Sequence, residues 1–280
     1  MSQTALADVQ NQIIKYWAPL YTNLLRERHL LGALVNKAYF GEIKDMGDTV
    51  KVSQVDDPDG ELLTAGVDAD QFNPEKATTQ YVDVTANKRA VVSYQFESLV
   101  KLQSQLASVD FQNKFVYGIE KQINTYLYSL VSPSLSAPDH DYADSSIGLA
   151  EMAKYARLAS EAKWPDPERW FALFSPQYWE TINTNTTFGS RDFVDIQPVV
   201  SGVRARKISG INCYEDNSRT GKYGIIFHPD FLYFVMQQAM QMKVSDLHGN
   251  KQFAYVISGD VVFGAKLGLE GALKHIRTAA

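Results

Sequence analysis

The sequence VDFQNKFVYGIEKQINTYLYSLV, residues 109–131, contains the clearest helical pattern of the chain. Apolar side chains recur every three or four residues along it, at Val116, Ile119, Ile123, Leu127 and Leu130. This spacing places them on one face of a helix roughly 35 Å long, at about 1.5 Å per residue. A long helix with a single apolar stripe is typical of one that lies across a sheet, so we expect it to be the spine of the fold.

Two short strand patterns precede this helix and flank a long acidic stretch. Residues 49–53 and 81–85 alternate apolar and polar side chains, as strands with one covered face do, and we expect them to pair. Residues 54–79 between them have little apolar content, and Lys76 is their only basic residue. Their acidic residues include Asp56, Asp57, Asp59, Glu61, Asp68 and Asp70. The pattern predicts an extended hairpin with an acidic tip, although a solvated surface loop without a function has the same composition.

The residues before the hairpin form a predicted helical arm. Apolar spacing over residues 5–37 is helical, but Pro19 interrupts one continuous helix because proline lacks the backbone donor and clashes with the preceding turn. We therefore expect two short helices. The first eleven residues lack the basic and apolar regions of a secretory signal, and no apolar run approaches the ~18 residues of a membrane span.

The sequence after the long helix alternates helix and strand patterns. Residues 132–146 are rich in Ser, Pro and Asp and predict a linker. A helix is expected over 147–163, then a buried strand at 170–174. Ser175 and Pro176 are an N-cap and a first-turn proline that open a further helix at 177–182. This order predicts a mixed α/β layer.

The same order is expected once more, with a strand at 224–227 and a helix after His228 and Pro229. That helix would bury Phe231, Leu232, Val235, Met236 and Ala239. The carboxyl end has strand patterns at 253–257 and 261–263, joined by an expected turn at 258–260. These strands follow the long helix by more than a hundred residues, so the unit that contains the helix must close around an inserted one.

The composition is that of a folded protein without a strong charge bias. The 280 residues are 45% hydrophobic and 21% charged, with a formal net charge of -5. This charge argues against a protein whose main work is to bind nucleic acid through its phosphates. The single cysteine, Cys213, excludes an internal disulfide.

No sequence motif points to catalysis or metal binding. The five histidines are scattered, and H-E-x-x-H, G-x-S-x-G and the phosphate-binding glycine motifs do not occur. The best metal candidates are Asp139, His140, Asp141 and Asp144, and Asp246 with His248. Asp and His are also ordinary turn residues, and Cys213 lies in a half-buried strand pattern rather than in a recognisable catalytic one. We expect no enzyme, no metal and no cofactor, with a hydrolase or metalloenzyme as a rival class.

The order of the elements resembles the major capsid proteins of tailed bacteriophages, which have the Hong Kong 97 type capsid fold. The resemblance begins with LVNKAYFGEIK and MGDTVKV, residues 34–44 and 46–52. It continues through the hairpin, the long helix, an α/β unit and returning strands. Further stretches in the same order are residues 170–182, 210–217, 225–236 and 261–266. These are turn and strand patterns, so their collinear order over nearly the whole chain carries the likeness.

The resemblance implies an α+β, Hong Kong 97-like phage capsid fold in five segments. They are an N-terminal arm (1–47), an extended loop hairpin (48–90), a peripheral domain with the spine helix (91–133), an inserted axial α/β domain (134–241) and returning peripheral-domain strands (242–280). In such proteins the extended loop lies over a neighbouring subunit, so its acidic residues are expected at the subunit interface.

Basic residues elsewhere in the chain are the expected counterparts of these acidic residues in the next subunit. They are Lys88, Arg89, Arg204, Arg206 and Lys207. While exposed, each such ion pair is worth at most about 1 kcal/mol, so it would set register while apolar burial holds the subunits. For the cluster at 204–207, a solvated strand edge that discourages unwanted pairing is the alternative.

The implied function is that of a major capsid protein that self-assembles into hexamers and pentamers, forming an icosahedral head around double-stranded DNA. An encapsulin-like bacterial nanocompartment, whose shell has this fold and encloses a cargo enzyme, is the alternative. The implied partners are other copies of the chain, a separate scaffolding protein, a portal protein and packaged DNA held by weak contacts, with room for a decoration protein. No membrane is involved. The expected location is the virion capsid, assembled in the host cytoplasm.

Overall fold

The computed structural model describes residues 27, 29–39, 49–55, 62, 79–97, 109–134, 141–185, 205–249 and 252–277. The predicted arm before residue 27, most of the acidic stretch, Asp139, His140 and Arg204 lie outside these residues. Of the second arm helix expected up to residue 37, the described residues form only the four-residue helix Leu31–Leu34. The described part contains one two-stranded, one three-stranded and one six-stranded sheet. Together with its helices, it has the predicted α+β composition.

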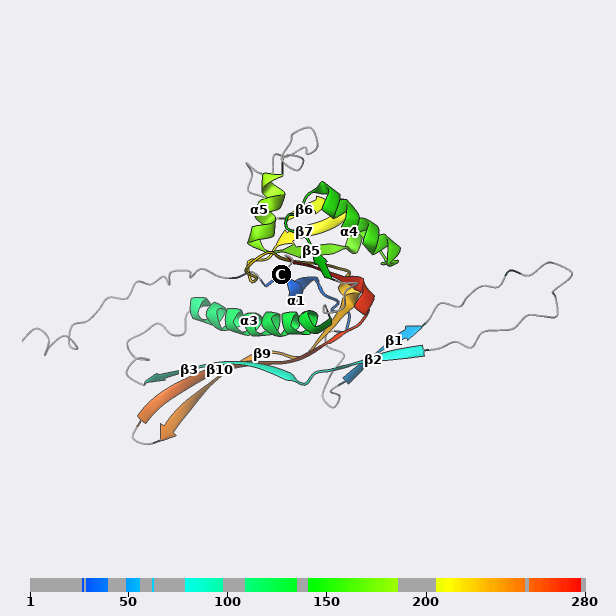
Figure 1. The fold of residues 1–280 in the computed structure, drawn as a ribbon. Helices are drawn as coiled ribbons and strands as arrows, with labels where there is room; N and C mark the ends of the chain where they lie inside the picture. Colours follow the sequence, from blue (N-terminus) through cyan, green and yellow to red (C-terminus); the bar gives the residue numbers. More distant parts are fainter. Residues whose placement is uncertain are drawn as a thin grey trace, which may run out of the picture.

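Helix α3 (Val109–Ser134) confirms the predicted spine and continues past the stop expected at Ser132 and Pro133. It lies on a three-stranded antiparallel sheet with the order β3-β10-β9 (Figure 1). The strands are β3 (Lys88–Glu97), β9 (Leu232–Gly249) and β10 (Gln252–Leu267). The Tyr126 ring on α3 meets the Phe263 ring on β10 edge-on, with centroids 5.5 Å apart. This contact helps to hold the helix on the sheet.

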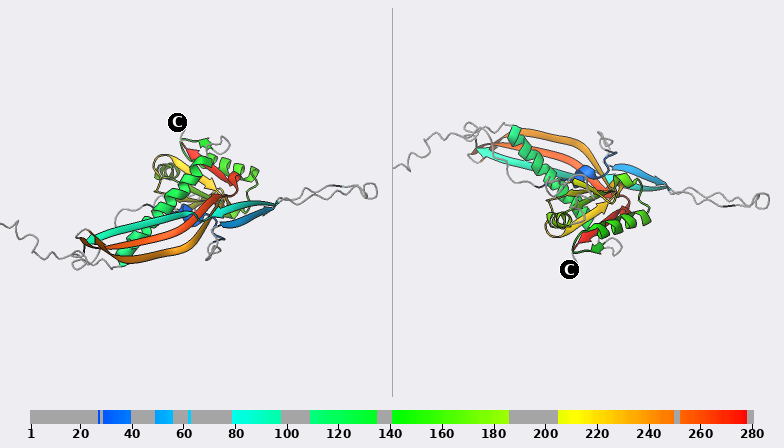
Figure 2. Two further views of the ribbon diagram at one scale, coloured as in Figure 1. Left: turned by 90° about the horizontal axis from the view of Figure 1, so that it is seen from below. Right: turned by 90° about the horizontal axis from the view of Figure 1, so that it is seen from above.

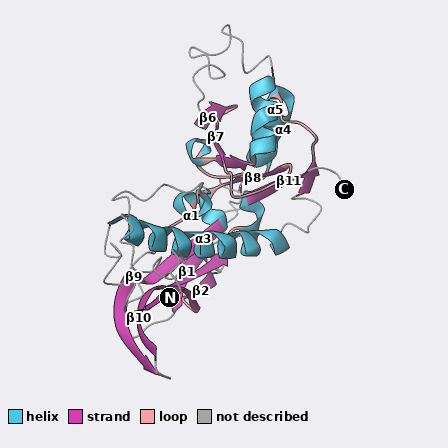
Figure 3. Cartoon of the chain, turned by 90° about the vertical axis from the view of Figure 1, so that its left-hand side faces the viewer, coloured by secondary structure: helices cyan, strands magenta, loops and turns pink. Residues whose placement is uncertain are grey.

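A six-stranded sheet with the order β4-β11-β8-β5-β7-β6 forms the second large layer. Its strands are β4 (Asp141–Ala143), β5 (Phe171–Phe174), β6 (Ala205–Ile208), β7 (Ile211–Glu215), β8 (Tyr223–Phe227) and β11 (Leu273–Arg277). The pairs β5–β7 and β4–β11 are parallel and the others antiparallel. Figure 3 shows α3 between this sheet and the three-stranded sheet.

Helices α4 (Leu149–Glu161) and α5 (Pro176–Thr184) accompany the six-stranded sheet, which confirms the predicted α/β layer. The short helices are α1 (Leu31–Leu34) and the 3-10 turns η3 (Pro167–Arg169), η4 (Pro229–Phe231) and η5 (Glu270–Ala272). One main core joins them, and its largest fully buried side chains are Trp179, Tyr155, Tyr178, Phe174, Phe227 and Phe231. Among the described helices, none is long and apolar enough to cross a membrane.

The helix predicted after Pro229 is wrong. The chain forms only the turn η4 there and then continues as β9, the longest strand of the described part. The four residues from Leu232 to Val235 are all buried, because β9 packs against a different layer on each face. A strand covered on both sides has no polar alternation, so its short apolar run looks the same as a buried helix.

The turn expected at Ser258-Gly259-Asp260 is also wrong. These residues lie inside β10, which pairs with β3 on one side and β9 on the other, and the register shifts only between Asp260 and Phe263. Gly and Asp in this stretch therefore mark an irregularity in a long strand rather than its end.

The sheets cut across the predicted segment boundaries. Strand β9 runs across residue 241, where the axial segment was expected to end. Strand β11, which lies within the expected peripheral segment 242–280, pairs with β8 and β4 of the six-stranded sheet. The two strands thus do not follow the expected boundary at residue 241, and the five segments as separate parts of the fold stay a prediction.

Candidate assembly site

The predicted hairpin pairs as expected and lies at one end of the molecule. Strands β1 (Thr49–Val55) and β2 (Thr79–Thr85) are antiparallel, with Thr49 opposite Thr85 and Val55 opposite Thr79. Figures 1 and 2 show this two-stranded sheet beyond the end of the three-stranded sheet, pointing away from it. Strands β1 and β2 therefore project from the fold rather than lying inside it.

One face of the hairpin is apolar and packs on β9. Val52, Val84 and Ala86 form a small cluster with Tyr233 and Val235, and all five side chains are buried. We call this cluster the hairpin root. The opposite face carries Lys51, Ser53, Tyr81 and Asp83, which are exposed. Tyr81 is 61% exposed. This alternation is the one that the sequence predicted for strands with one covered face.

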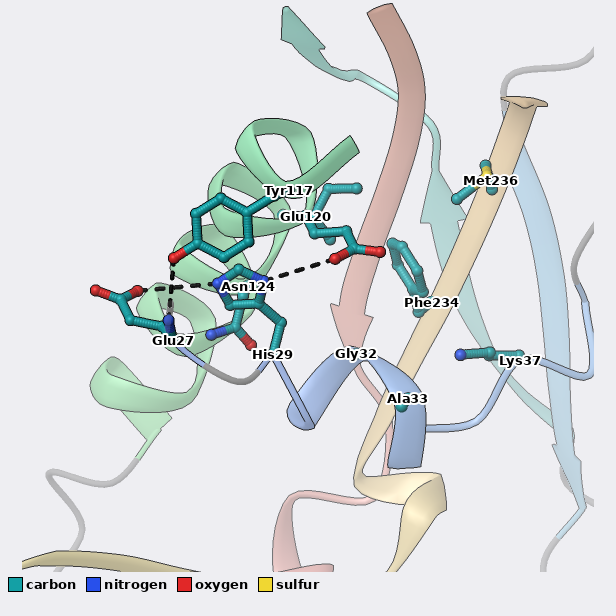
Figure 4. A pocket seen from close by; sticks show the side chains of 11 residues that line it. Glu27, His29, Gly32, Ala33, Lys37, Tyr117, Glu120, Asn124, Phe234 and Met236 are labelled. Carbon is teal, nitrogen blue, oxygen red and sulfur yellow. Dashed lines mark hydrogen bonds and ion pairs between the residues drawn. The ribbon is translucent and has the colours of Figure 1, made fainter. Parts of the chain in front are cut away.

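A second attachment joins the residues before α1 to the spine helix, and Figure 4 shows it closely. The His29 ring stacks on the Tyr117 ring of α3, with centroids 5.0 Å apart. Its Nε2 lies 3.8 Å from Glu27 Oε2, and its Nδ1 lies 3.8 Å from Glu120 Oε2 on α3. The Glu27 backbone N–H donates to the Tyr117 hydroxyl at 3.1 Å. We call these four residues the arm seat.

A cavity of about 310 Å³ adjoins the arm seat, between α1, α3 and β9 (Figure 4). Gly32, Lys37, Asn124 and Phe234 are among its lining residues. Burial lowers the pKa of Lys37. The lining mixes carboxylates, a lysine and apolar side chains, so the cavity as a whole favours no single ligand charge.

A third attachment follows α1. The Asn36 amide donates to Asp230 Oδ1 at 2.5 Å, and its backbone N–H donates to the Pro229 carbonyl at 3.2 Å. Its carbonyl in turn accepts from the Phe234 N–H at 3.1 Å. Asn36 therefore ties the chain between the arm and the hairpin to the start of β9. Sequence reasoning missed it because its partners are far away in the chain.

The predicted basic counterparts are mostly engaged within the chain. The guanidinium of Arg89 donates to Asp260 Oδ2 through Nε at 2.8 Å and through Nη2 at 2.5 Å. The Lys88 ammonium lies 5.6 Å from the Tyr126 ring centroid. Both side chains are exposed, so their contacts do not block a second partner.

The basic cluster at 204–207 is only partly described. Arg206 donates through Nη2 to Asn183 Oδ1 at 2.5 Å and lies over the Trp179 ring, 5.7 Å from its centroid. Its Nε and Nη1 are buried, and burial lowers its pKa. Lys207 is exposed. Arg206 thus faces inward, which makes it a poorer counterpart for another subunit than Lys207.

The acidic residues predicted at the interface, from Asp56 to Asp70, lie outside the described residues. Their pairing with basic residues therefore stays a prediction.

The groups of the rival enzyme class show no catalytic arrangement in the part of the chain that is described. The Asp144 carboxylate accepts a hydrogen bond from the Tyr155 hydroxyl and lies 3.6 Å from Lys154 Nζ. Cys213 lies on the buried face of β7, whose alternating burial confirms the expected half-buried strand, and burial raises the pKa of its thiol to about 12, so the thiol stays protonated at neutral pH. Across the described ranges, no three His, Cys, Asp or Glu residues are grouped as metal ligands would be.

Comparison by sequence finds no relative. No model of a known protein family matches the chain, and no curated protein matches it.

Comparison by structure finds phage proteins that share the fold over nearly their whole length. A chain from Mycobacterium phage Che8 has a TM-score of 0.73 at 15% identity, with 94% of this chain and 96% of that one covered. The capsid of Cyanophage P-SCSP1u gives 0.72 at 10% identity, with coverage of 97% and 94%. The mature capsid of bacteriophage PhiM1 gives 0.66 at 8% identity, with coverage of 95% and 92%. The chain therefore shares its fold, the Hong Kong 97-type fold expected from the sequence, with these phage capsid structures.

Proposed function

We propose that this chain is the major capsid protein of a tailed bacteriophage. In this proposal, copies of the chain assemble into hexamers and pentamers that form an icosahedral head around double-stranded DNA. The protein acts in the virion capsid after assembly in the host cytoplasm, and it has a structural rather than an enzymatic role.

The observation that carries the proposal is the match in fold to capsid structures over nearly the full length of both chains. A match to a single shared layer would leave the hairpin unexplained. Here at least 94% of this chain is covered in each of the three comparisons, which is far more than a single layer.

The hairpin itself supports a role in assembly. A two-stranded hairpin alone is marginally stable in water, and within residues 49–55 and 79–85 the buried apolar side chains of this one are those of the root. Its opposite face is exposed and carries Tyr81, a large amphipathic side chain of the type enriched at protein interfaces. A neighbouring subunit is the partner that would cover such a face in a shell.

The physics of shells requires no catalytic group. Head-to-tail contacts close into rings, and weak contacts repeated over many copies yield a durable container. The net charge of -5 suits a wall around DNA, since a strongly basic lining would bind the genome tightly. A separate scaffolding protein, a portal protein and a decoration protein are the further partners that this role implies.

The test is assembly. The chain would be expressed alone and together with the reading frames that neighbour its gene, then examined by size-exclusion chromatography and negative-stain electron microscopy. Closed shells, or rings that close only when a scaffold is supplied, would support the proposal. A well-folded monomer under both conditions would contradict it, and shells filled with a cargo enzyme would favour the nanocompartment instead.

A further inference from the structure

We propose that Gly264 is a positioning residue for the extended hairpin. Because Gly264 has no side chain, the backbone that leads from β2 into β3 lies directly on β10, and this contact sets the direction in which β1 and β2 leave the molecule. The claim that this direction matters for assembly rests on the proposed function. The claim that Gly264 sets the direction does not.

The first step is the closeness of two backbones. A Cβ atom placed on Gly264 would lie 2.0 Å from the Thr85 carbonyl oxygen, 2.7 Å from the Thr85 carbonyl carbon and 2.8 Å from the Ala86 Cα. All three are backbone atoms, so no change of side-chain rotamer relieves the overlap. Any other residue at position 264 requires the end of β2 to move. A glycine within a strand often marks such an approach of another backbone.

The second step is the place of this contact along the chain. Thr85 is the last residue of β2 and lies opposite Thr49, the first residue of β1, with their hydroxyl oxygens 3.1 Å apart. The Asn87 N–H donates to the Thr85 carbonyl at 3.1 Å, and β3 begins at Lys88. Thr85 to Asn87 are therefore the joint between the hairpin and the three-stranded sheet. A displacement there rotates both hairpin strands together.

The third step is the layer beneath the joint. Phe234, Val261 and Phe263 belong to the main core on the α3 side of the β9–β10 pair. Tyr233 and Val235 belong to the hairpin root on the other side. Gly264 pairs with Val235 in the β9–β10 register, so the close approach lies within the root.

A second glycine supports the same contact. A Cβ atom on Gly268 would lie 2.3 Å from Cε2 of Tyr233 and 2.7 Å from the Asp230 carbonyl oxygen. The space left at Gly268 lets the Tyr233 ring lie over the root, where it meets the Tyr39 ring edge-on with centroids 5.9 Å apart. Two glycines of β10 and the loop after it thus shape the surface on which the hairpin rests.

The experiment compares Gly264→Ala with Gly271→Ala as a matched control, since a Cβ atom on Gly271 would meet no atom within 4 Å. In the full chain, nitroxide labels are attached to Tyr81→Cys in β2 and Ala153→Cys in α4, both exposed positions. Cys213 is fully buried and stays unlabelled in the folded protein. The distance distribution between the labels is measured by double electron–electron resonance on unassembled protein.

We expect one narrow distance distribution for the parent chain and for Gly271→Ala. Tyr81 lies roughly 13 Å along the strand from Thr85 at about 3.3 Å per residue, so a rotation of about 15° at the joint shifts it by roughly 3 Å. Gly264→Ala should produce such a shift or a clear broadening. An unchanged distribution in folded Gly264→Ala protein would overturn the proposal.

A second variant covers the case in which Gly264→Ala does not fold. Val84→Ala empties part of the root without placing any atom against the backbone of β10. It should broaden the same distribution, and a narrow parent-like one would overturn the idea that the root holds the hairpin.

Assembly is measured separately with the same variants. Gly264→Ala should lose shells under conditions in which the parent chain and Gly271→Ala form them. If the parent chain never assembles, the proposed function fails while the distance result still tests the joint. Parent-like shells from Gly264→Ala with a shifted distance would overturn the link between hairpin direction and assembly.

Discussion

The six-stranded sheet and the hairpin root are stabilised by very different amounts of burial. Strands β5 and β8 are buried along nearly their whole length and belong to the main core. The root has five buried side chains, and they cover one face of the hairpin only. The difference separates two roles: the sheet stabilises the subunit, whereas the root orients a projecting part. Changes in the sheet should therefore unfold the protein, and changes in the root should alter how it assembles.

The largest effect is expected in the six-stranded sheet. Phe227 in β8 is fully buried and packs against the rings of Phe171 and Phe231, with centroids 6.1 and 4.9 Å away. Phe227→Ala should lower the free energy of unfolding by about 3–5 kcal/mol, because it removes a large buried ring and leaves a cavity. Urea denaturation measures this loss. Val91→Ala, at a position 49% exposed, is the control and should change stability by no more than about 0.5 kcal/mol.

A smaller effect is expected in the root. Val52→Ala removes two buried methyl groups and should lower the free energy of unfolding by roughly 1–2 kcal/mol at most. Hydrogen exchange should accelerate in β1 and β2, while β5 and β8 keep the protection of the parent chain. Equal acceleration in both regions would show that root and sheet unfold as one unit, and the separation of roles would then be wrong.

The sequence predicted the parts of this comparison that depend on local pattern. The stripe of α3 and the alternation of β1 and β2 are repeats within one element. The alternation is confirmed, and the stripe is confirmed except at Val116, which is exposed. The chain after Pro229 was predicted as a helix because β9 is covered on both faces, which removes the alternation. Gly264 could not be recognised, because the atom it makes room for, the Thr85 carbonyl oxygen, belongs to a distant part of the sequence. Local periodicity predicts elements, whereas close approaches between them require the fold.

The dependence of stability on pH should also differ between the two regions, because the buried histidine that causes it follows β8 of the six-stranded sheet. His228 follows β8 and is fully buried, and its Nδ1 accepts from the Asp230 N–H at 3.3 Å. Burial lowers the pKa of His228, with Asp230 and Asp166 opposing that shift and Arg169 adding to it. The unfolded chain then binds more protons, so stability should fall as the pH drops through about 6.5 toward the lowered pKa.

The variant His228→Asn keeps an acceptor for the Asp230 N–H and removes the titrating group. Urea denaturation at pH 7.5 and 5.5 should show a smaller loss of stability in the variant than in the parent chain. The same loss in both proteins would assign the acid sensitivity to other groups. Between pH 7.5 and 5.5, the root should lose less protection against hydrogen exchange than the six-stranded sheet does.

The smallest effect is expected at the arm seat, where residues 27–29 contact α3 and His29 lies between two carboxylates. The Glu120 side chain is 57% exposed and lies 3.8 Å from His29 Nδ1. The His29 side chain is only 8% exposed, but the carboxylate is solvated, and a contact with a solvated charge contributes at most about 1 kcal/mol, so Glu120→Gln should cost no more than roughly 0.5 kcal/mol. A double-mutant cycle with His29→Gln isolates the contact, and the coupling should shrink as the salt concentration rises, because dissolved ions screen the exposed Glu120 carboxylate. A coupling that does not change with salt would mean that the stacking of His29 on Tyr117, rather than the contact with Glu120, joins residues 27–29 to the spine helix, and the arm seat would then be an apolar attachment like the root.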